Sequence, residues 1–292
     1  MGQMLSSKEV TFDDGKTTKG TPRKPPTLPA PPSVLLYWWM ITHVDGIAAA
    51  AVAGQPQPLF PNLDSVTSWR RFELLDLPAA GVCVTDDVGE EAGYLLLSGQ
   101  VTIEQDQMQV EGHAPAAIRC LANRPHRVVA GQLGARLLSI GVDTAGVNGG
   151  ELAMDVMARD RLPWRDAIHG GGGRIGTRHL FGPQDFASSW TFVDHAILSA
   201  SSSLGYHYHD HLEEAFIVLS GRGWMTLGDT TVEIGPGDVT LQQANVRHGL
   251  YNPFTADLDF VRVAVATPGQ TFTTIDVADD LRARRPTQEN RT

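Results

Sequence analysis

The sequence predicts an all-β protein built from two tandem antiparallel barrels, with few short helices. Its 292 residues include 30 Gly and 18 Pro, a composition typical of a turn-rich fold that contains more strand than helix. Short apolar runs recur between turn signals, at a spacing typical of a sandwich or a barrel. The same pattern occurs in two halves of the chain at a constant offset, which indicates a duplicated domain.

The first strand-rich half covers about residues 60–145, and its apolar runs are residues 92–97, 101–103, 117–121, 128–129 and 137–142. The second half covers about residues 187–266, with runs at residues 190–199, 215–219, 223–227, 231–234, 239–241 and 259–266. Between the halves we expect a linker with helical character at residues 151–159. The glycine run at 170–173 lacks the strand and helix of a phosphate loop, so we expect it to be flexible.

An offset of 122 residues relates the two halves without gaps. It places 97–99 (Leu-Ser-Gly) on 219–221, 110–111 (Val-Glu) on 232–233, and His126 on His248. Three matches at one offset favour duplication over coincidence.

These patterns divide the chain into five parts. We expect a flexible leader at 1–33, a first barrel with an N-terminal arm at 34–148, a linker at 149–186, a second barrel at 187–280 and a flexible tail at 281–292. The Pro-rich leader cannot bury enough apolar surface to order itself, and the natural start can be as late as Met40. The apolar run 34–41 is too short to cross a bilayer and is interpreted as a strand or an arm that packs on a neighbour.

Charge and cysteine usage exclude several classes of protein. The formal net charge of −10 disfavours nucleic acid and anionic membranes as partners. The first thirty residues have no apolar core of a secretory signal. Cys83 and Cys120 are interpreted as buried thiols in a reducing compartment, so we expect a cytoplasmic protein.

The second half contains a constellation of metal-ligating residues. His207 and His209 are two residues apart, so on a strand both imidazoles project from one face. A short turn then brings Glu214 onto the next strand, and His248 opens a later one. Three imidazoles and a carboxylate inside an apolar barrel are costly without a cation, and this N/O donor set suits one divalent transition metal: Fe²⁺, Mn²⁺, Ni²⁺, Zn²⁺ or Cu²⁺.

Two other choices of ligand remain open. His209 and His211 also form a His-x-His pair, but only two residues would then precede Glu214, so His211 is interpreted as a turn or supporting residue. Glu213 competes with Glu214, yet Glu214 keeps the six-residue gap to Gly221. A barrel that holds only hydrogen-bonded core histidines is the alternative to a metal site.

These residues resemble the two motifs of the cupin superfamily. The first motif is met by His207, His209, Glu214 and Gly221, and the second by the Pro-Gly-Asp segment 236–238, His248 and Asn252. The leading glycine of the first motif is replaced by Ser201. The resemblance implies a double-stranded β-helix (jelly roll), repeated, with the metal in the second copy, and it favours a homodimer.

The first barrel does not have the same ligands. At the offset of 122, the positions of His207, His209 and Glu214 hold Thr85, Asp87 and Ala92, and only His126 matches a ligand. This barrel is therefore predicted to be a degenerate copy that serves packing, dimerisation or pocket closure, with His126 as a hydrogen-bonded core residue.

Other residues give weaker signals. Arg262 is a lone charge in an apolar strand, for which an outward position is favoured over one that holds a substrate carboxylate inside the barrel. Tyr206 and Tyr208 alternate with the ligands and should point away from them, and Phe216 and Val218 share the face of Glu214. Outside the motifs are three histidines expected to be structural or exposed: His169, His179 and His195.

Three functions are compatible with this site. The favoured one is an Fe(II)-dependent oxygenase or dioxygenase that acts on a small-molecule substrate, with a carboxylate as one candidate. The second is a redox-neutral isomerase, lyase or decarboxylase that uses Mn, Ni or Zn, with Glu214 as a ligand and Glu213 or His211 moving protons. The third is a ligand-binding module without catalysis.

Overall fold

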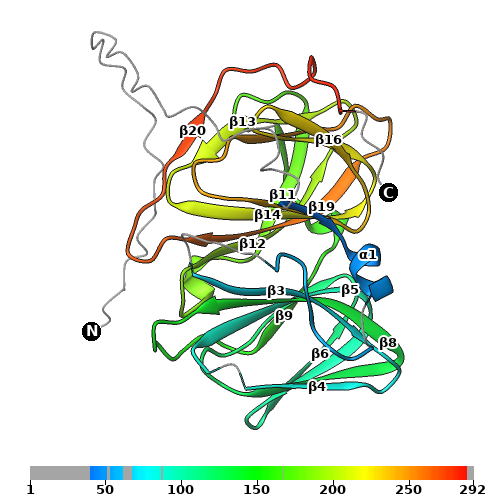
Figure 1. Ribbon diagram of the computed structural model, residues 1–292, viewed down its shortest axis with the longest axis vertical. Coiled ribbons are helices and arrows are strands. Elements are labelled where there is room, and N and C mark those ends of the chain that lie inside the picture. Colours follow the sequence, from blue (N-terminus) through cyan, green and yellow to red (C-terminus); the bar gives the residue numbers. More distant parts are fainter. Residues whose placement is uncertain (1–39, 51–52, 62–67, 87, 167, 288–292) are drawn as a thin grey trace, which may run out of the picture. The chain divides into compact units, whose positions relative to one another are not determined.

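The computed structural model describes residues 40–50, 53–61, 68–86, 88–166 and 168–287, and strands dominate its secondary structure (Figure 1). The strands form three sheets in which the neighbouring strands are antiparallel. Short helical segments accompany them: α1 (Val44–Ala50), η3 (Arg159–Arg161) and η4 (Pro183–Asp185). The predicted all-β fold with few short helices is confirmed.

The first sheet, called here the N-terminal barrel, has eight strands. Six of them follow the order β2-β3-β8-β5-β7-β9, while β4 pairs with β8 and β6 pairs with β5. Their bounds are β2 (Gln57–Pro58), β3 (Trp69–Leu77), β4 (Val82–Thr85), β5 (Glu90–Gln105), β6 (Met108–His113), β7 (Ala116–Arg119), β8 (His126–Asp143) and β9 (Ala153–Val156).

The other two sheets form what we call the C-terminal barrel. The seven-stranded sheet has the order β1 (Ile41–His43), β17 (Asp238–Gln242), β14 (Leu212–Ser220), β19 (Leu258–Ala266), β12 (Trp190–Leu198), β11 (Arg174–Phe181) and β10 (Trp164–Asp166). The five-stranded sheet has the order β16 (Thr230–Ile234), β15 (Gly223–Leu227), β18 (His248–Tyr251), β13 (Ser203–His209) and β20 (Thr274–Asp276).

The backbone supports the predicted duplication. Gly99 and Gly221 have φ angles of 81° and 80°, and Asn123 and Asn245 have φ angles of 59° and 65°. Both pairs are separated by the same 122 residues. A Cβ on Gly221 would lie 2.2 Å from the carbonyl oxygen of Asp257, so this turn requires glycine.

Residues 149–186 contain strands that pair with both barrels. β9 pairs with β7 of the N-terminal barrel, whereas β11 pairs with β12 of the C-terminal barrel. The helical character predicted for residues 151–159 was wrong, because residues 153–156 extend the sheet of β7 and only a short 3₁₀ turn follows. Sheet pairing outweighed the weak helical propensity of this segment.

The apolar runs form the core as expected. One hydrophobic cluster contains buried residues of both barrels, among them Phe72, Leu138, Val193 and Val263. The carboxylate of Glu91, which is completely buried, accepts backbone hydrogen bonds from Ala187 and Ser188. Cys83 and Cys120 are buried thiols, as predicted.

The ends of the described chain pack on the C-terminal barrel. Of the apolar run 34–41, only residues 40–41 are described, and β1 continues it by pairing with β17 of the same chain. The leader at 1–33 lies outside the described residues. In the segment expected to be a flexible tail, Leu281 is 4% exposed and the Thr287 amide donates to Thr231. In the part of the chain that is described, no helix has the length and apolar character needed to cross a membrane.

Candidate metal centre

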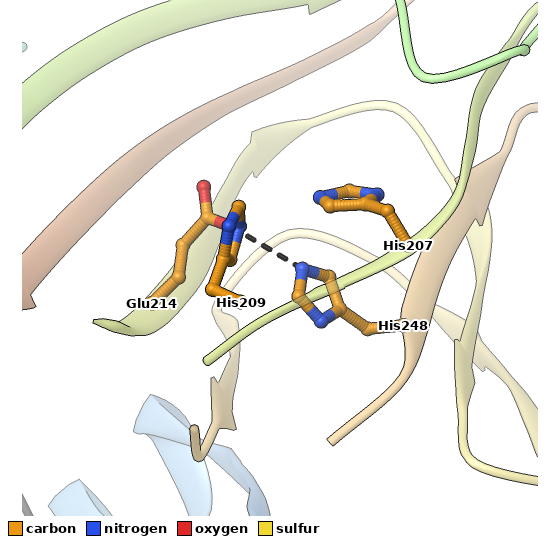
Figure 2. Close-up of side chains that lie close together, drawn as sticks. All are labelled: His207, His209, Glu214 and His248. Atoms are coloured by element: carbon orange, nitrogen blue, oxygen red, sulfur yellow. Dashed lines mark ion pairs between the residues drawn. The ribbon is translucent and has the colours of Figure 1, made fainter. Parts of the chain in front are cut away.

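Three strands of the C-terminal barrel supply the predicted ligands (Figure 2). β13 carries His207 and His209 on one face, and β14, which follows a short turn, carries Glu214. β18 begins with His248, which is the register partner of His207. The alternation of side chains along β13 and the pairing of β13 with β18 therefore direct all three imidazoles into the barrel.

The four side chains converge closely. Each offers one ligand atom, and these four atoms all lie within 4.8 Å of one another. The Oε2 atom of Glu214 is 3.5 Å from Nε2 of His209 and 3.4 Å from Nε2 of His248. All four residues are buried, with exposed fractions of 7% for His209 and at most 1% for the others.

Hydrogen bonds to the far ring nitrogens orient the imidazoles. Nδ1 of His207 is 3.0 Å from the carbonyl oxygen of Gly205, and Nδ1 of His248 is 2.9 Å from that of Val246. Since a carbonyl only accepts, Nδ1 carries the proton in both rings and Nε2 presents a lone pair. Nδ1 of His209 is 3.0 Å from the hydroxyl of Thr274, an arrangement that permits the same tautomer.

The atoms that face the centre lack hydrogen bonds. Nε2 of His207, Nε2 of His248 and both carboxylate oxygens of Glu214 have no hydrogen-bond partner among the described residues. Lone pairs that face a buried carboxylate repel it unless a cation lies between them. Three imidazole nitrogens and one carboxylate are a donor set that divalent transition metals accept, so these residues fit such an ion.

The protonation states also fit a cation. Burial and the neighbouring His248 lower the pKa of His207 to about 2, so its ring is neutral at physiological pH. Burial raises the pKa of Glu214, but surrounding side chains, including Arg262, reverse this effect and hold the pKa well below its usual value. The centre thus presents a neutral imidazole at His207 and an ionised carboxylate at Glu214, the forms that bind metals.

Arg262 faces the barrel interior, and the outward position favoured from the sequence was wrong. It is the register partner of Phe216 on β14, which shares the face of Glu214. Its Nη1 is 3.4 Å from Oε1 of Glu214, and its Nη2 donates a 2.7 Å hydrogen bond to Asp194. The lone charge is accommodated because the buried carboxylate of Asp194 pairs with it.

His169 also lies at the site, although the sequence placed it outside. Its ring stacks on that of His207 with centroids 4.0 Å apart, and its Nδ1 is 3.0 Å from Asp276 of β20. A Cβ on Gly171 would lie 2.0 Å from the carbonyl oxygen of Ser203. The glycine run thus packs directly against β13, in contrast to the flexible linker that was predicted.

The remaining predicted residues have different positions. Glu213 is completely buried but adjoins Glu214 along β14, so it faces the opposite side of the strand, and His211 lies in the turn between β13 and β14. Neither belongs to the four-residue cluster, and their roles in moving protons stay predictions. His179 contacts Asp194, and Nε2 of His195 is 2.9 Å from Asp259, so both are structural, as expected.

At the corresponding position of the N-terminal barrel, His126 forms hydrogen bonds with two side chains. The hydroxyl of Tyr94 is 2.6 Å from Nε2 of His126, and the hydroxyl of Thr85 is 3.0 Å from its Nδ1. Ala92 supplies no carboxylate, and Asp87 lies outside the described residues. Tyr94 corresponds to Phe216 at the offset of 122 residues. Its hydroxyl group, which a phenylalanine lacks, is the group that lies within hydrogen-bond distance of His126.

Sequence reasoning missed Asp194, Thr274 and Gln242. Asp194 is a lone acidic residue in the apolar run 190–199, a signal equivalent to that of Arg262. Thr274 lies outside both motifs, and no local pattern marks it. Gln242 is the register partner of Glu214, a relation visible only once β14 and β17 are paired.

Comparisons with known proteins agree with this architecture. Residues 195–264 match a family model described as a cupin domain. An oxalate-binding protein of Thermotoga maritima is 26% identical over 98 residues, which cover 34% of this chain and 81% of that protein.

Two solved structures share the fold over more of the chain. A cupin 2 conserved barrel domain protein from Leptotrichia buccalis has a TM-score of 0.55 and 13% identity, covering 77% of this chain and 95% of that chain. An oxalate decarboxylase of Lactobacillus farciminis, in a formate complex, has a TM-score of 0.53 and 12% identity, covering 72% of this chain and 80% of that chain. Together with the two motifs, the family match confirms the resemblance to the cupin superfamily, with residues 195–264 as the matched cupin domain, and the solved structures show the same barrel fold.

Proposed function

We propose that the C-terminal barrel binds one divalent transition metal through His207, His209, Glu214 and His248, and that it binds the carboxylate group of a small substrate next to this metal. The observation that carries the proposal is the set of four converging ligand atoms, most of which have no hydrogen-bond partner in the described chain. Four protein ligands leave coordination positions for a substrate.

Electrostatics favours an anionic substrate. The charges of a divalent metal and of Arg262 together exceed those of the Glu214 and Asp194 carboxylates, so the loaded centre is positive. In a buried site with low dielectric, this excess attracts a carboxylate strongly. The likeness to an oxalate-binding protein supports the same class of ligand.

The chemistry that follows is proposed to be redox-neutral, as in a lyase or decarboxylase. A bound divalent metal would supply a Lewis acid that polarises the carboxylate or an adjacent carbonyl. Arg262, held by Asp194, stabilises negative charge beside Glu214, and the buried wall of the barrel excludes water. The Fe(II) dioxygenase favoured from the sequence uses the same four ligands, and the relative that binds oxalate is what shifts the proposal toward carboxylate chemistry.

Calorimetric titration with oxalate tests this function. The metal-loaded protein should bind oxalate, and the protein stripped by a chelator should lose that binding and regain it when Mn²⁺ is restored. Oxalate binding that is independent of metal would contradict the proposal. Oxygen consumption that depends on iron and on an added carboxylate would instead establish the dioxygenase.

A further inference from the structure

Besides the candidate metal ligands, the C-terminal barrel contains another buried polar side chain, Gln242, with an atom that lacks a hydrogen bond among the described residues. Gln242 ends β17 and is the register partner of Glu214 on β14. Directly opposite residues of an antiparallel pair project from the same face with their Cβ atoms about 5 Å apart. The amide of Gln242 therefore lies inside the barrel beside Glu214, and the residue is 1% exposed.

Only one end of this amide is paired. Nε2 of Gln242 donates a 2.7 Å hydrogen bond to the hydroxyl of Thr240, whereas Oε1 has no hydrogen-bond partner among residues that the structure describes. Rotating the amide by half a turn would pair the oxygen with Thr240 and leave the NH₂ group unpaired instead. In either orientation one hydrogen-bonding group of Gln242 is buried beside Glu214 without a partner, which costs the fold the desolvation of that group.

A barrel wall that only had to be filled would contain an apolar residue at this position. Phe216 and Val218, on the face of β14 that carries Glu214, are buried and apolar, whereas Thr240, on the same face of β17 as Gln242, is the polar partner that Gln242 already uses. A buried amide that is kept despite its cost indicates a partner that arrives with the ligand.

We propose that Gln242 hydrogen-bonds a hydroxyl group on the carboxylate that the metal holds, so that the substrates are hydroxycarboxylates. This inference rests on the proposed function of the same site. A hydroxyl group both donates and accepts, so it satisfies Gln242 in either orientation of the amide. A site that hydrogen-bonds a substrate hydroxyl also rejects the analogue that lacks it, because the buried amide is then left unpaired.

Tartronate and malonate provide the test, because they differ by a single hydroxyl group. Their affinities for the metal-loaded protein are measured by calorimetry, in the wild type and in Gln242→Met, which keeps the side-chain volume and removes the amide. The wild type should prefer tartronate by at least about tenfold, the value of one buried hydrogen bond. The variant should reduce this preference to less than about twofold, with unchanged metal content and unchanged malonate affinity.

The comparison of ratios separates Gln242 from the metal, which can also bind the hydroxyl. Gln243→Met, at the half-buried neighbouring position, is the matched control and should keep the wild-type preference. If Gln242→Met does not fold or does not hold metal, Gln242→Asn retracts the amide by one methylene and should also lose the preference.

An unchanged tartronate preference in the folded variants would overturn the inference, and it would indicate that Gln242 binds only water. A wild type that binds malonate without preferring tartronate would overturn the inference and leave the proposed function standing. A wild type that binds neither anion when loaded with metal would contradict both.

Discussion

The buried ion pair between Arg262 and Asp194 makes the C-terminal barrel sensitive to one substitution. Their side chains are 9% and 4% exposed, and Nη2 of Arg262 lies 2.7 Å from the Asp194 carboxylate. Arg262→Met fills the same space but leaves the buried carboxylate of Asp194, whose other ion-pair partner is the exposed side chain of His179. Breaking a buried pair in this way costs about 3–5 kcal/mol, so the free energy of unfolding should fall by that amount.

Chemical denaturation of the metal-free protein at constant pH measures this loss. Arg262→Met/Asp194→Asn removes both charges and should recover most of the stability, because an uncompensated charge is no longer buried. Arg70→Met is the control, since its ion pair with Asp143 has side chains that are 53% and 32% exposed and should contribute less than about 1 kcal/mol. A loss in Arg262→Met as small as that of the control, or a double variant as unstable as the sum of both single variants, would refute the reasoning.

Three further predictions concern hydrogen bonds and pH. Tyr94→Phe should lower the free energy of unfolding by about 1 kcal/mol without changing the metal content, because it removes the 2.6 Å hydrogen bond between the Tyr94 hydroxyl and Nε2 of the buried His126. The pKa of His207 is lowered to about 2 in the folded state against about 6.5 when unfolded, so the unfolded state binds more protons below neutral pH. The metal-free protein should therefore lose about 2 kcal/mol between pH 7 and 5, measured by denaturant titration at each pH. The hydrogen bond with Asp194 raises the pKa of His179, so this group stabilises the fold below about pH 6.5 and the effect disappears as the pH rises through the raised pKa. Thermal unfolding of His179→Gln should lack this dependence, and an identical pH profile in the variant would contradict it.

Local patterns were sufficient to predict the strands and the convergence of the four candidate ligands. The spacing of His207, His209 and Glu214 places them on two strands joined by a short turn, and the structure has that turn between β13 and β14. The offset of 122 residues identified His126 as the partner position of His248 and Ala92 as the missing carboxylate. Such features depend on residues that are near in sequence or related by the repeat.

Features that depend on pairing between distant strands could not be predicted. The sequence favoured an outward position for Arg262 because its partner Asp194 lies 68 residues earlier, and only the pairing of β12 with β19 brings the two side chains together. His169 joins the site because the glycine run packs against β13, and no periodicity marks a contact of this kind. Gln242 becomes interpretable only from its register with Glu214.

Metal content of the purified protein tests the central claim most directly. The wild type should hold one equivalent of a divalent transition metal by elemental analysis. His209→Ala should lose this metal, whereas His126→Ala, which changes the matching position of the N-terminal barrel, should keep it. Equal metal content in the wild type and in His209→Ala, or loss of the metal in His126→Ala alone, would contradict the account.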